Sequence, residues 1–559
     1  MAQVTEPDRG SGVRGAIRRA LRSPALLLFL GVFCLYMGNA KGYIDSGDAQ
    51  GRFAVANRIW HDQSIFLAAD DPWIQNSGIR AFTPDGQGIS FYSLGQSITM
   101  LPGVIVADLA SHLISEPRRE EFRYLAAQFF FTVLTLPFLA ALGVVCFYIL
   151  ARRLGLEEKY ALWASAALAF GTYYGAYAKT VGMNVEICLL YLGALVVYTG
   201  GPRTALRVAA TSTLLGLTFH YRQEFLIPVV LGLIALAVQA RRDSELTTRW
   251  CFNILWPCFV LGCLALLHNY VRSGNVMEPF PGFYGLYQDG EISDALAGST
   301  PVAENTYLFG RWPLEFLPVG LFGFHKGIFW FSPVLFALAL GVVYRSRAWT
   351  RSLTLGAIPF AGYLAFIGSL NWLDSEGGWG PRYLLPSISF FVLAGAYWLR
   401  PIARSSSGRV LLASAVLVGA SLQVFISFEG NNHLLAQVAE ATRQFEGEPT
   451  SWQRSLIAAR LRNAGWSYDD PAFTEVWSSP EVGALASKSS DQLWWTKLAM
   501  KSGSPVVRNG LAAVGVCVLL AGLLFLLRAA LLRPRGANER ATETPWSVPL
   551  GSVEAVARG

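Results

Sequence analysis

The stretch 43–58 holds acidic residues at a spacing that suits proton-transfer chemistry. Asp45 and Asp48 stand three residues apart, directly after the first long apolar run. In a helix this spacing places both carboxylates on one face, and Arg52 follows one turn beyond Asp48. A carboxylate in such a place can act as the general base for a hydroxyl group. The same pattern is also typical of a capped helix just outside a membrane, with Arg52 as an ion-pair partner of Asp48.

Four basic residues at the ends of later apolar runs form a second set of candidate functional residues. They are Lys179, Arg222, Lys326 and Arg382. Charges at membrane depth are costly and are usually kept for pairing or function. Several cations beside carboxylates would suit an anionic headgroup, such as a lipid phosphate or pyrophosphate. Each cation taken singly is also consistent with a side chain that reaches toward lipid headgroups.

The composition indicates an all-α polytopic membrane protein. Of 559 residues, 53% are hydrophobic and 15% are charged, and the mean hydropathy is +0.38; soluble domains carry about 25% charged residues. Apolar runs long enough to cross a bilayer recur along the chain. The net charge of +7 does not indicate nucleic-acid binding, because the basic residues lie in short loops between these runs. The seven cysteines are scattered and predict neither a disulfide nor a metal site.

About twelve membrane spans are predicted from the apolar runs. They lie at about 24–40, 123–151, 160–178, 184–200, 205–220, 224–240, 250–270, 327–344, 352–369, 381–399, 409–427 and 508–532. Alternate short loops carry arginines and share a side with the Arg-rich N-terminus, so both termini are predicted to be cytoplasmic. The four cations and the two aspartates then share the opposite face. The first span is predicted to be retained, although Gly38-Asn39-Ala40 is similar to a signal-peptidase site.

The spans divide the chain into five regions. These are a cytoplasmic tail (1–23), a transmembrane module (24–427) with a first outer loop (41–122), an extracytoplasmic insert (428–507), a last span (508–532) and a cytoplasmic tail (533–559). Within the first outer loop, the segment 94–113 is semi-apolar but is interrupted by Pro102 and Asp108. This pattern predicts a helix that lies in the membrane interface.

Several blocks resemble a known family when they are taken in order. They are Ser46-Gly-Asp-Ala-Gln-Gly-Arg-Phe53, Tyr92-Ser-Leu-Gly-Gln-Ser97, Ala169-Phe-Gly-Thr-Tyr173 with Tyr177-Ala-Lys-Thr180, His325-Lys-Gly-Ile-Phe-Trp-Phe-Ser-Pro333 and Gly378-Trp-Gly-Pro-Arg-Tyr-Leu-Leu-Pro386. The order and topology are similar to the GT-C superfamily of polytopic glycosyltransferases, in the branch with protein O-mannosyltransferases and the lipid A aminoarabinose transferase. The likeness runs from about residue 25 to 400. It implies a GT-C type transmembrane helical bundle with juxtamembrane helices in the outer loops.

The resemblance also implies an activity. Such enzymes move a sugar from a polyprenyl-phosphate-linked donor to an envelope glycan, lipid or protein on the non-cytoplasmic face, here of a bacterial-type inner membrane, by inverting displacement. It implies Asp48 as the general base, with Asp45 the nearest competitor, and the four cations as ligands of the donor phosphate. Many members carry a second acidic residue where the fourth span begins. Asn184 stands at that position here, so Glu186 is the possible second carboxylate. No cofactor is expected, and a divalent metal is left open.

Other classes of function fit part of the pattern. A transporter or flippase of lipid-linked saccharides also needs a cation-lined cavity, but it would usually show internal repeats, which we do not find. A glycan ligase that acts on a lipid pyrophosphate would use the cations and make less use of Asp48. A non-catalytic scaffold is the third alternative.

Overall fold

The computed structural model describes residues 22–44, 47–71, 74, 83, 86–90, 92–179, 183–273, 276, 320–322, 327–335, 355, 358–369, 384–396, 402, 405–427, 493–495, 498 and 504–531. These residues are mostly helical, and none of them forms a β-strand; Leu67 and Gly88 make one isolated bridge. The predicted all-α class is confirmed for this part of the chain.

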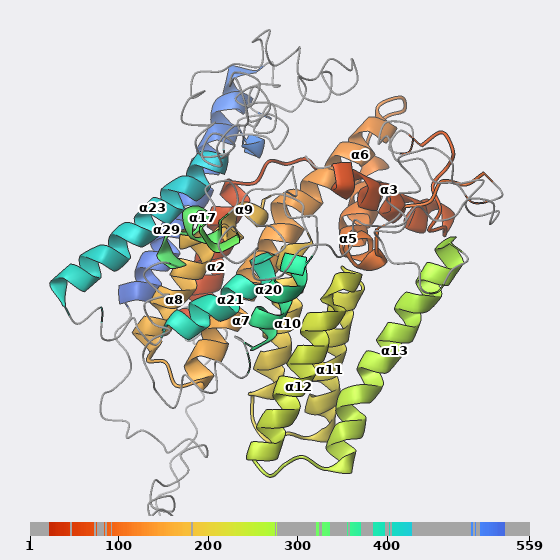
Figure 1. Ribbon diagram of the computed structural model, residues 1–559. Helices are drawn as coiled ribbons and strands as arrows, with labels where there is room; N and C mark the ends of the chain where they lie inside the picture. Colours follow the sequence, from red (N-terminus) through yellow and green to blue (C-terminus); the bar gives the residue numbers. More distant parts are fainter. Residues whose placement is uncertain are drawn as a thin grey trace, which may run out of the picture.

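Four helices are long and apolar enough to cross a membrane. They are α5 (Leu94–Ser111), the continuous helix Arg119–Arg153, α13 (Thr248–Ser273) and α29 (Pro505–Leu531). Further helices lie in the predicted spans: α2 (Pro24–Gly38), α8 (Glu158–Gly171), α10 (Asn184–Tyr198), α11 (Ala205–Phe219), α12 (Leu226–Arg242), α20 (Ile358–Ser369), α21 (Leu385–Ala396) and α23 (Ser406–Ser427). By their length and composition these helices make the chain a multi-pass membrane protein. Figure 1 shows how they are arranged in a bundle. The full count of spans stays a prediction.

The connections between helices gather at two opposite ends of the bundle. At one end, Arg153 donates to the carbonyl of Val196, and Arg203 pairs with Asp243 and, at 2.7 Å, with Glu245. We call this the arginine end. At the other end, the backbone N–H of Gly95 donates to the carbonyl of His220 at 2.8 Å. We call this the far end. The loops that carry Arg153, Arg203 and Asp243 therefore share an end as predicted. Arg345, Arg347, Arg351, Arg400 and Arg404 lie outside the described residues, so the side of their loops stays a prediction, as does the cytoplasmic assignment of the arginine end.

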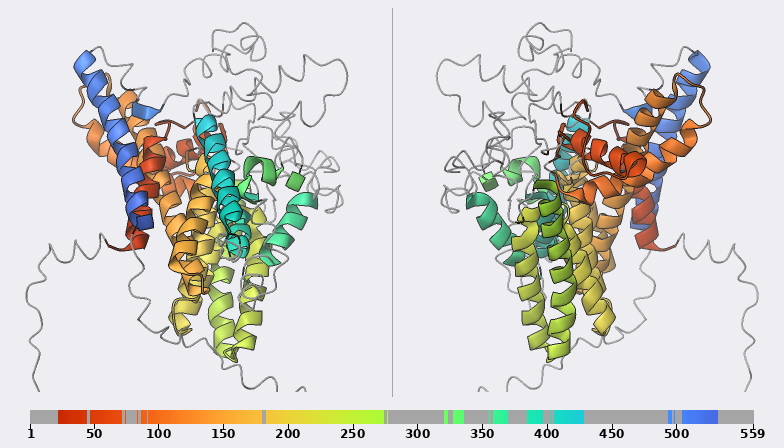
Figure 2. Two further views of the ribbon diagram at one scale, coloured as in Figure 1. Left: turned by 90° about the vertical axis from the view of Figure 1, so that its left-hand side faces the viewer. Right: turned by 90° about the vertical axis from the view of Figure 1, so that its right-hand side faces the viewer.

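The first and last described spans pack directly against each other. A Cβ on Gly522 of α29 would lie 3.0 Å from the carbonyl oxygen of Gly31 and 2.8 Å from Cγ of Leu35. Gly31 itself faces Leu526. Small residues allow this close approach of two membrane helices. In Figure 2, α2 in red and α29 in blue lie side by side in both views.

The helix that contains Arg119–Arg153 is uninterrupted but not uniform. It runs as α6 (Arg119–Phe129), the π-helical segment η1 (Phe130–Thr135) and α7 (Leu136–Arg153). The hydroxyl of Thr132 donates to the carbonyl of Gln128 at 2.8 Å, which supplies a partner where the wider turn changes the backbone pattern. The helix in the structure therefore begins at Arg119, four residues before the predicted span 123–151.

Two predicted spans are interrupted in the structure. For 160–178, α8 ends at Gly171 and a short helix α9 (Tyr174–Tyr177) follows, because the Thr172 hydroxyl bonds Leu168 O at 2.6 Å and accepts from Tyr174 N at 3.2 Å. For 327–344, the short helix α17 (Ile328–Phe331) ends at Ser332, since a proline disfavours helical backbone in the residue before it. Residues 336–344 of that range lie outside the described residues.

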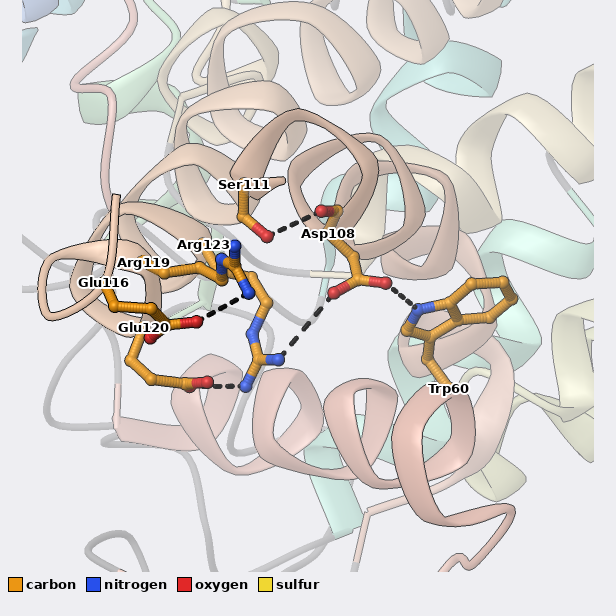
Figure 3. A network of polar contacts seen from close by, with 7 residues as sticks. All are labelled: Trp60, Asp108, Ser111, Glu116, Arg119, Glu120 and Arg123. Atoms are coloured by element: carbon orange, nitrogen blue, oxygen red, sulfur yellow. Dashed lines mark hydrogen bonds and ion pairs between the residues drawn. The ribbon is translucent and has the colours of Figure 1, made fainter. Parts of the chain in front are cut away.

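The first outer loop contributes a helix, α3 (Gly47–Asp62), that packs on α5 and contacts α6 through Tyr124, which meets Phe53 and donates to Gln50. Trp60 of α3 donates to Asp108 of α5 at 3.1 Å, and Arg123 of α6 lies 3.7 Å from the same carboxylate (Figure 3). Arg123 also bonds Glu120 at 2.5 Å. Asp108, which interrupts the apolar pattern, therefore joins three helices at the far end. The helix predicted at 94–113 is confirmed as α5, and its interfacial location stays a prediction.

The α2–α29 contact yields a test of stability. Gly522→Val should destabilise the protein by about 1–3 kcal/mol, because the added carbons meet the backbone of α2. Gly510→Val on the same helix is the matched control, since a Cβ there meets nothing within 4 Å. Thermal unfolding in detergent would compare the two. Equal melting temperatures for both variants would contradict the close contact.

Candidate functional site

Glu186 is a carboxylate buried at the far end of the bundle. It lies in the first turn of α10 and is 1% exposed. Its Oε1 accepts a hydrogen bond from Nε2 of Gln96 at 3.0 Å. Within the described part of the chain, its Oε2 has no hydrogen-bond partner, and the same holds for Oε1 of Gln96 and Oδ1 of Asn184. Because buried polar atoms are nearly always satisfied, these three acceptors are candidates to bind a ligand or water.

Arg52 supplies a cation beside this carboxylate. It is 2% exposed, and its guanidinium carbon lies 4.5 Å from the centroid of the Tyr92 ring. It is close enough to Glu186 to attract that carboxylate electrostatically. Arg52 lies on the buried face of α3 with Ala49, Phe53 and other apolar residues. A charge at such a site persists in the folded state only when partners offset its lost hydration.

Tyr221 closes the cluster from the C-terminal end of α11. Its hydroxyl lies 2.6 Å from the hydroxyl of Thr99 on α5. Burial, and then the negative charge of Glu186, raise the pKa of Tyr221 to about 12, so the phenol stays protonated at neutral pH. Gly95 brings α5 this close, because a Cβ at that position would lie 2.7 Å from the carbonyl oxygen of His220.

Arg272 fixes the segment that carries Tyr92. It lies near the far end of α13 and is buried. Its Nη1 donates to the carbonyls of Ser90 at 3.3 Å and Tyr92 at 3.5 Å, and its Nη2 donates to Asn269 at 3.4 Å. The Tyr92 ring under Arg52 is therefore held through its own backbone.

A second buried feature at this end is a pair of lysines. Lys179 follows α9 and is 5% exposed, and Lys41 follows α2 and is 2% exposed. Burial, and then repulsion from Lys41, lower the pKa of Lys179 to about 7. Two ammonium groups that repel each other in a buried setting favour a bound anion, which relieves the repulsion and supplies charge-assisted hydrogen bonds.

The structure describes some of the predicted site residues. Lys179 and Glu186 are buried at the far end, and half-buried Arg222 lies there after α11, directly before the 3-10 turn η2 (Gln223–Phe225). Asp48 is the second residue of α3, so its backbone lies one turn before Arg52. Outside the described residues lie Asp45, Lys326, Arg382 and the side chain of Asp48. The convergence of the four cations therefore stays a prediction.

Other members of the cluster were not predicted as site residues. Lys41 and Gln96 carried a signal in the sequence, since Lys41 follows the first apolar run directly and Gln96 is a polar residue in a semi-apolar helix. Tyr221 carried none, because its approach to Thr99 depends on how α11 packs against α5.

Neither a metal-binding group nor a match to a known protein assigns the site a role. Among the described residues, no group of three or more histidine, cysteine, aspartate or glutamate side chains is placed to hold a metal ion. Comparison with known proteins finds no matching family model and no matching curated protein. The role of the site has to be argued from its own residues.

The charge pair in the cluster predicts a specific pattern of stability. Arg52→Met should destabilise the protein by about 3–5 kcal/mol, because it leaves the Glu186 carboxylate buried without its cation. Adding Glu186→Gln should restore about 0.5–3 kcal/mol of this loss. Denaturant unfolding in mixed micelles measures Arg52→Met, Glu186→Gln and the double variant against the wild type.

A control for this prediction lies on the same helix. Arg58 pairs with Asp62 at 2.7 Å, but both side chains are substantially exposed. Arg58→Met should therefore change stability by only about 0–1 kcal/mol. Strictly additive effects of Arg52→Met and Glu186→Gln would show that the two groups do not interact.

Proposed function

We propose that the protein is an integral-membrane glycosyltransferase that moves a sugar from a polyprenyl-phosphate-linked donor to an envelope glycan, lipid or protein. One observation carries the proposal. A buried carboxylate with an open oxygen (Glu186) is attracted by the charge of a buried guanidinium (Arg52), at the same end of a membrane bundle as the buried pair Lys41 and Lys179. Charged groups in such surroundings are kept for ligands or chemistry. The motif order described for the GT-C superfamily supports the same assignment.

The lysine pair suits the donor phosphate. A phosphate between Lys41 and Lys179 would accept hydrogen bonds from both and would cancel their repulsion. As the bond between sugar and phosphate breaks, negative charge grows on the phosphate oxygen. Ammonium groups already in place stabilise that charge without reorganisation. Arg222, Lys326 and Arg382 are proposed to bind the same phosphate.

The carboxylates suit the acceptor. In the proposed step, the acceptor oxygen attacks the anomeric carbon, its proton passes to Asp48, and the phosphate leaves with the electron pair of the broken bond. This inverts the anomeric centre in a single displacement. Asp45 is the alternative base. Glu186 is the second carboxylate, which orients Arg52 and offers its open oxygen to a sugar hydroxyl.

The location of the reaction rests on charge patterning. Because arginine-rich loops mark the cytoplasmic side, the far end would face outward from a bacterial-type inner membrane, with both termini inside. A lipid-linked donor suits that face, since its activated sugar is carried by the membrane itself.

Asp48→Asn is the direct test of the proposal. This change keeps the size of the side chain but removes its basicity, so transfer should fall about 10²–10⁴-fold while donor binding persists. Asp45→Asn should have a milder effect. Asp62→Asn, in the last turn of the same helix, is the matched control. Transfer from a synthetic polyprenyl-phosphate sugar by purified variants measures the rates. Near-normal transfer by Asp48→Asn would refute its role, and a larger loss for Asp45→Asn would move the base three residues upstream.

The lowered pKa of Lys179 predicts how donor binding depends on pH. Above about pH 7 the free site loses the Lys179 proton, whereas bound phosphate holds it. Binding then takes up a proton, so the donor Kd should rise by up to about tenfold per pH unit above pH 7 and level off below it. A polyprenyl-phosphate sugar is a suitable probe, because its phosphodiester does not titrate in this range.

Two substitutions test whether the pH dependence of donor binding comes from Lys179. Lys179→Met should bind the probe weakly and without the rise above pH 7. Lys41→Met should move the rise to higher pH, since it removes the repulsion that helps to lower the Lys179 pKa. A Lys179→Met variant with the wild-type pH profile would contradict the assignment.

A further inference from the structure

We propose that Trp494 and Trp495 are positioning residues that hold the start of the first outer loop, and with it Lys41 and helix α3, in the geometry that the site requires. The functional part of this proposal rests on the proposed function. The two tryptophans lie next to Leu493, at the end of the predicted insert 428–507 and shortly before α29. We call the pair the indole clasp.

The clasp donates hydrogen bonds to carbonyl groups at the C-terminal end of α2. The last carbonyls of a helix have no partner within the helix. Here the indole Nε1 of Trp494 donates to Met37 O at 2.9 Å, and that of Trp495 donates to Gly38 O at 2.9 Å. The backbone N–H of Trp494 donates to Ala40 O at 3.0 Å. Three donors from one dipeptide therefore bind the last carbonyls of α2 and the carbonyl of Ala40, and hold the segment by which the chain leaves the helix.

Each ring of the clasp is itself held by another helix. The Trp494 ring meets Phe129 of α6 edge to face, with 5.4 Å between centroids. The Trp495 ring lies on Gly515 of α29, where a Cβ would come within 2.2 Å of it. Gly42 packs against Trp494 with a φ of +80°, a conformation that favours glycine. The clasp is therefore anchored on α6 and α29 while it binds α2.

The clasp is linked to the site through the chain that leaves α2. Lys41 follows Ala40, whose carbonyl the clasp binds, and the charge of Lys41 repels that of Lys179. The backbone N–H of Ile44 then donates to Gln128 at 2.9 Å. Gln50 of α3 donates to Ile44 O at 2.8 Å. A displacement of the α2 end would thus shift both Lys41 and the first turns of α3, where position 48 lies.

The test replaces both indoles with phenyl rings. Trp494→Phe/Trp495→Phe keeps aromatic packing but removes both indole donors. Hydrogen–deuterium exchange of the segment 39–44 should become about tenfold faster or more, since each lost hydrogen bond changes an equilibrium several-fold. Binding of a polyprenyl-phosphate sugar should weaken about 3- to 30-fold. Exchange in α10 and α11 should stay unchanged, which distinguishes loss of position from general unfolding.

Two further variants sharpen the result. Trp330→Phe is the matched control, because Trp330 makes the same kind of bond, from its indole to Phe322 O at 2.7 Å, in α17. Gly42→Ala should reproduce the effect of the double variant from the other side of the contact, since its Cβ would lie 2.8 Å from Cβ of Trp494. Unchanged exchange at 39–44 in the double variant, relative to Trp330→Phe, would overturn the proposal.

The exchange measurement and the binding measurement together distinguish a failure of this inference from a failure of the proposed function. The exchange arm needs no substrate, so it decides whether the clasp holds the loop. Faster exchange with unchanged probe binding would overturn the role of the clasp in the site. Failure of the wild-type protein to bind the polyprenyl-phosphate sugar would instead contradict the proposed function.

Discussion

The burial of charge at the far end of the bundle is the constraint on which the described structure depends. Glu186 and Arg52 lie in apolar surroundings, where an isolated ion is strongly disfavoured. The two charges come from different helices, Glu186 from α10 and Arg52 from α3. Gln96 of α5 binds Glu186, and Tyr92, which lies just before α5, packs against Arg52. The glycine contact at Gly95 and the hydrogen bonds of Arg272 support this arrangement, because both fix the start of α5. The arrangement is thus selected by electrostatics as much as by apolar packing.

Much of the helical architecture was predictable from the sequence, because membrane spans are specified by local composition. The apolar runs predicted most helix positions, and the arginine pattern predicted that the loops with Arg153, Arg203 and Asp243 lie at one end. The breaks at Thr172 and Ser332 were missed for local reasons: a hydroxyl that bonds the backbone and a proline that acts on the preceding residue. Neither changes the hydropathy of its segment, and a hydropathy pattern therefore cannot reveal it.

The site was less predictable than the fold. Lys179 stood out because a charge at a span end is conspicuous, and Glu186 was proposed from the family resemblance; both are buried. Tyr221 and the indole clasp were not foreseen, since their contacts join residues far apart in the sequence. Trp494 and Met37 are 457 positions apart, and no local pattern specifies such a pairing. The catalytic assignment of Asp48 stays a prediction.

The π-helical segment Phe130–Thr135 has a consequence for the relative orientation of the two halves of its helix. One residue corresponds to about 100° of rotation around an α-helix axis. The wide turn therefore acts as a rotary offset between α6, which presents Gln128 to Ile44, and α7, which packs in the bundle. Without the offset, the face of α6 that serves the first outer loop would turn away from it. The rotation of α6, which contacts the first outer loop, relative to α7 in the membrane bundle is thus set within a single turn of helix.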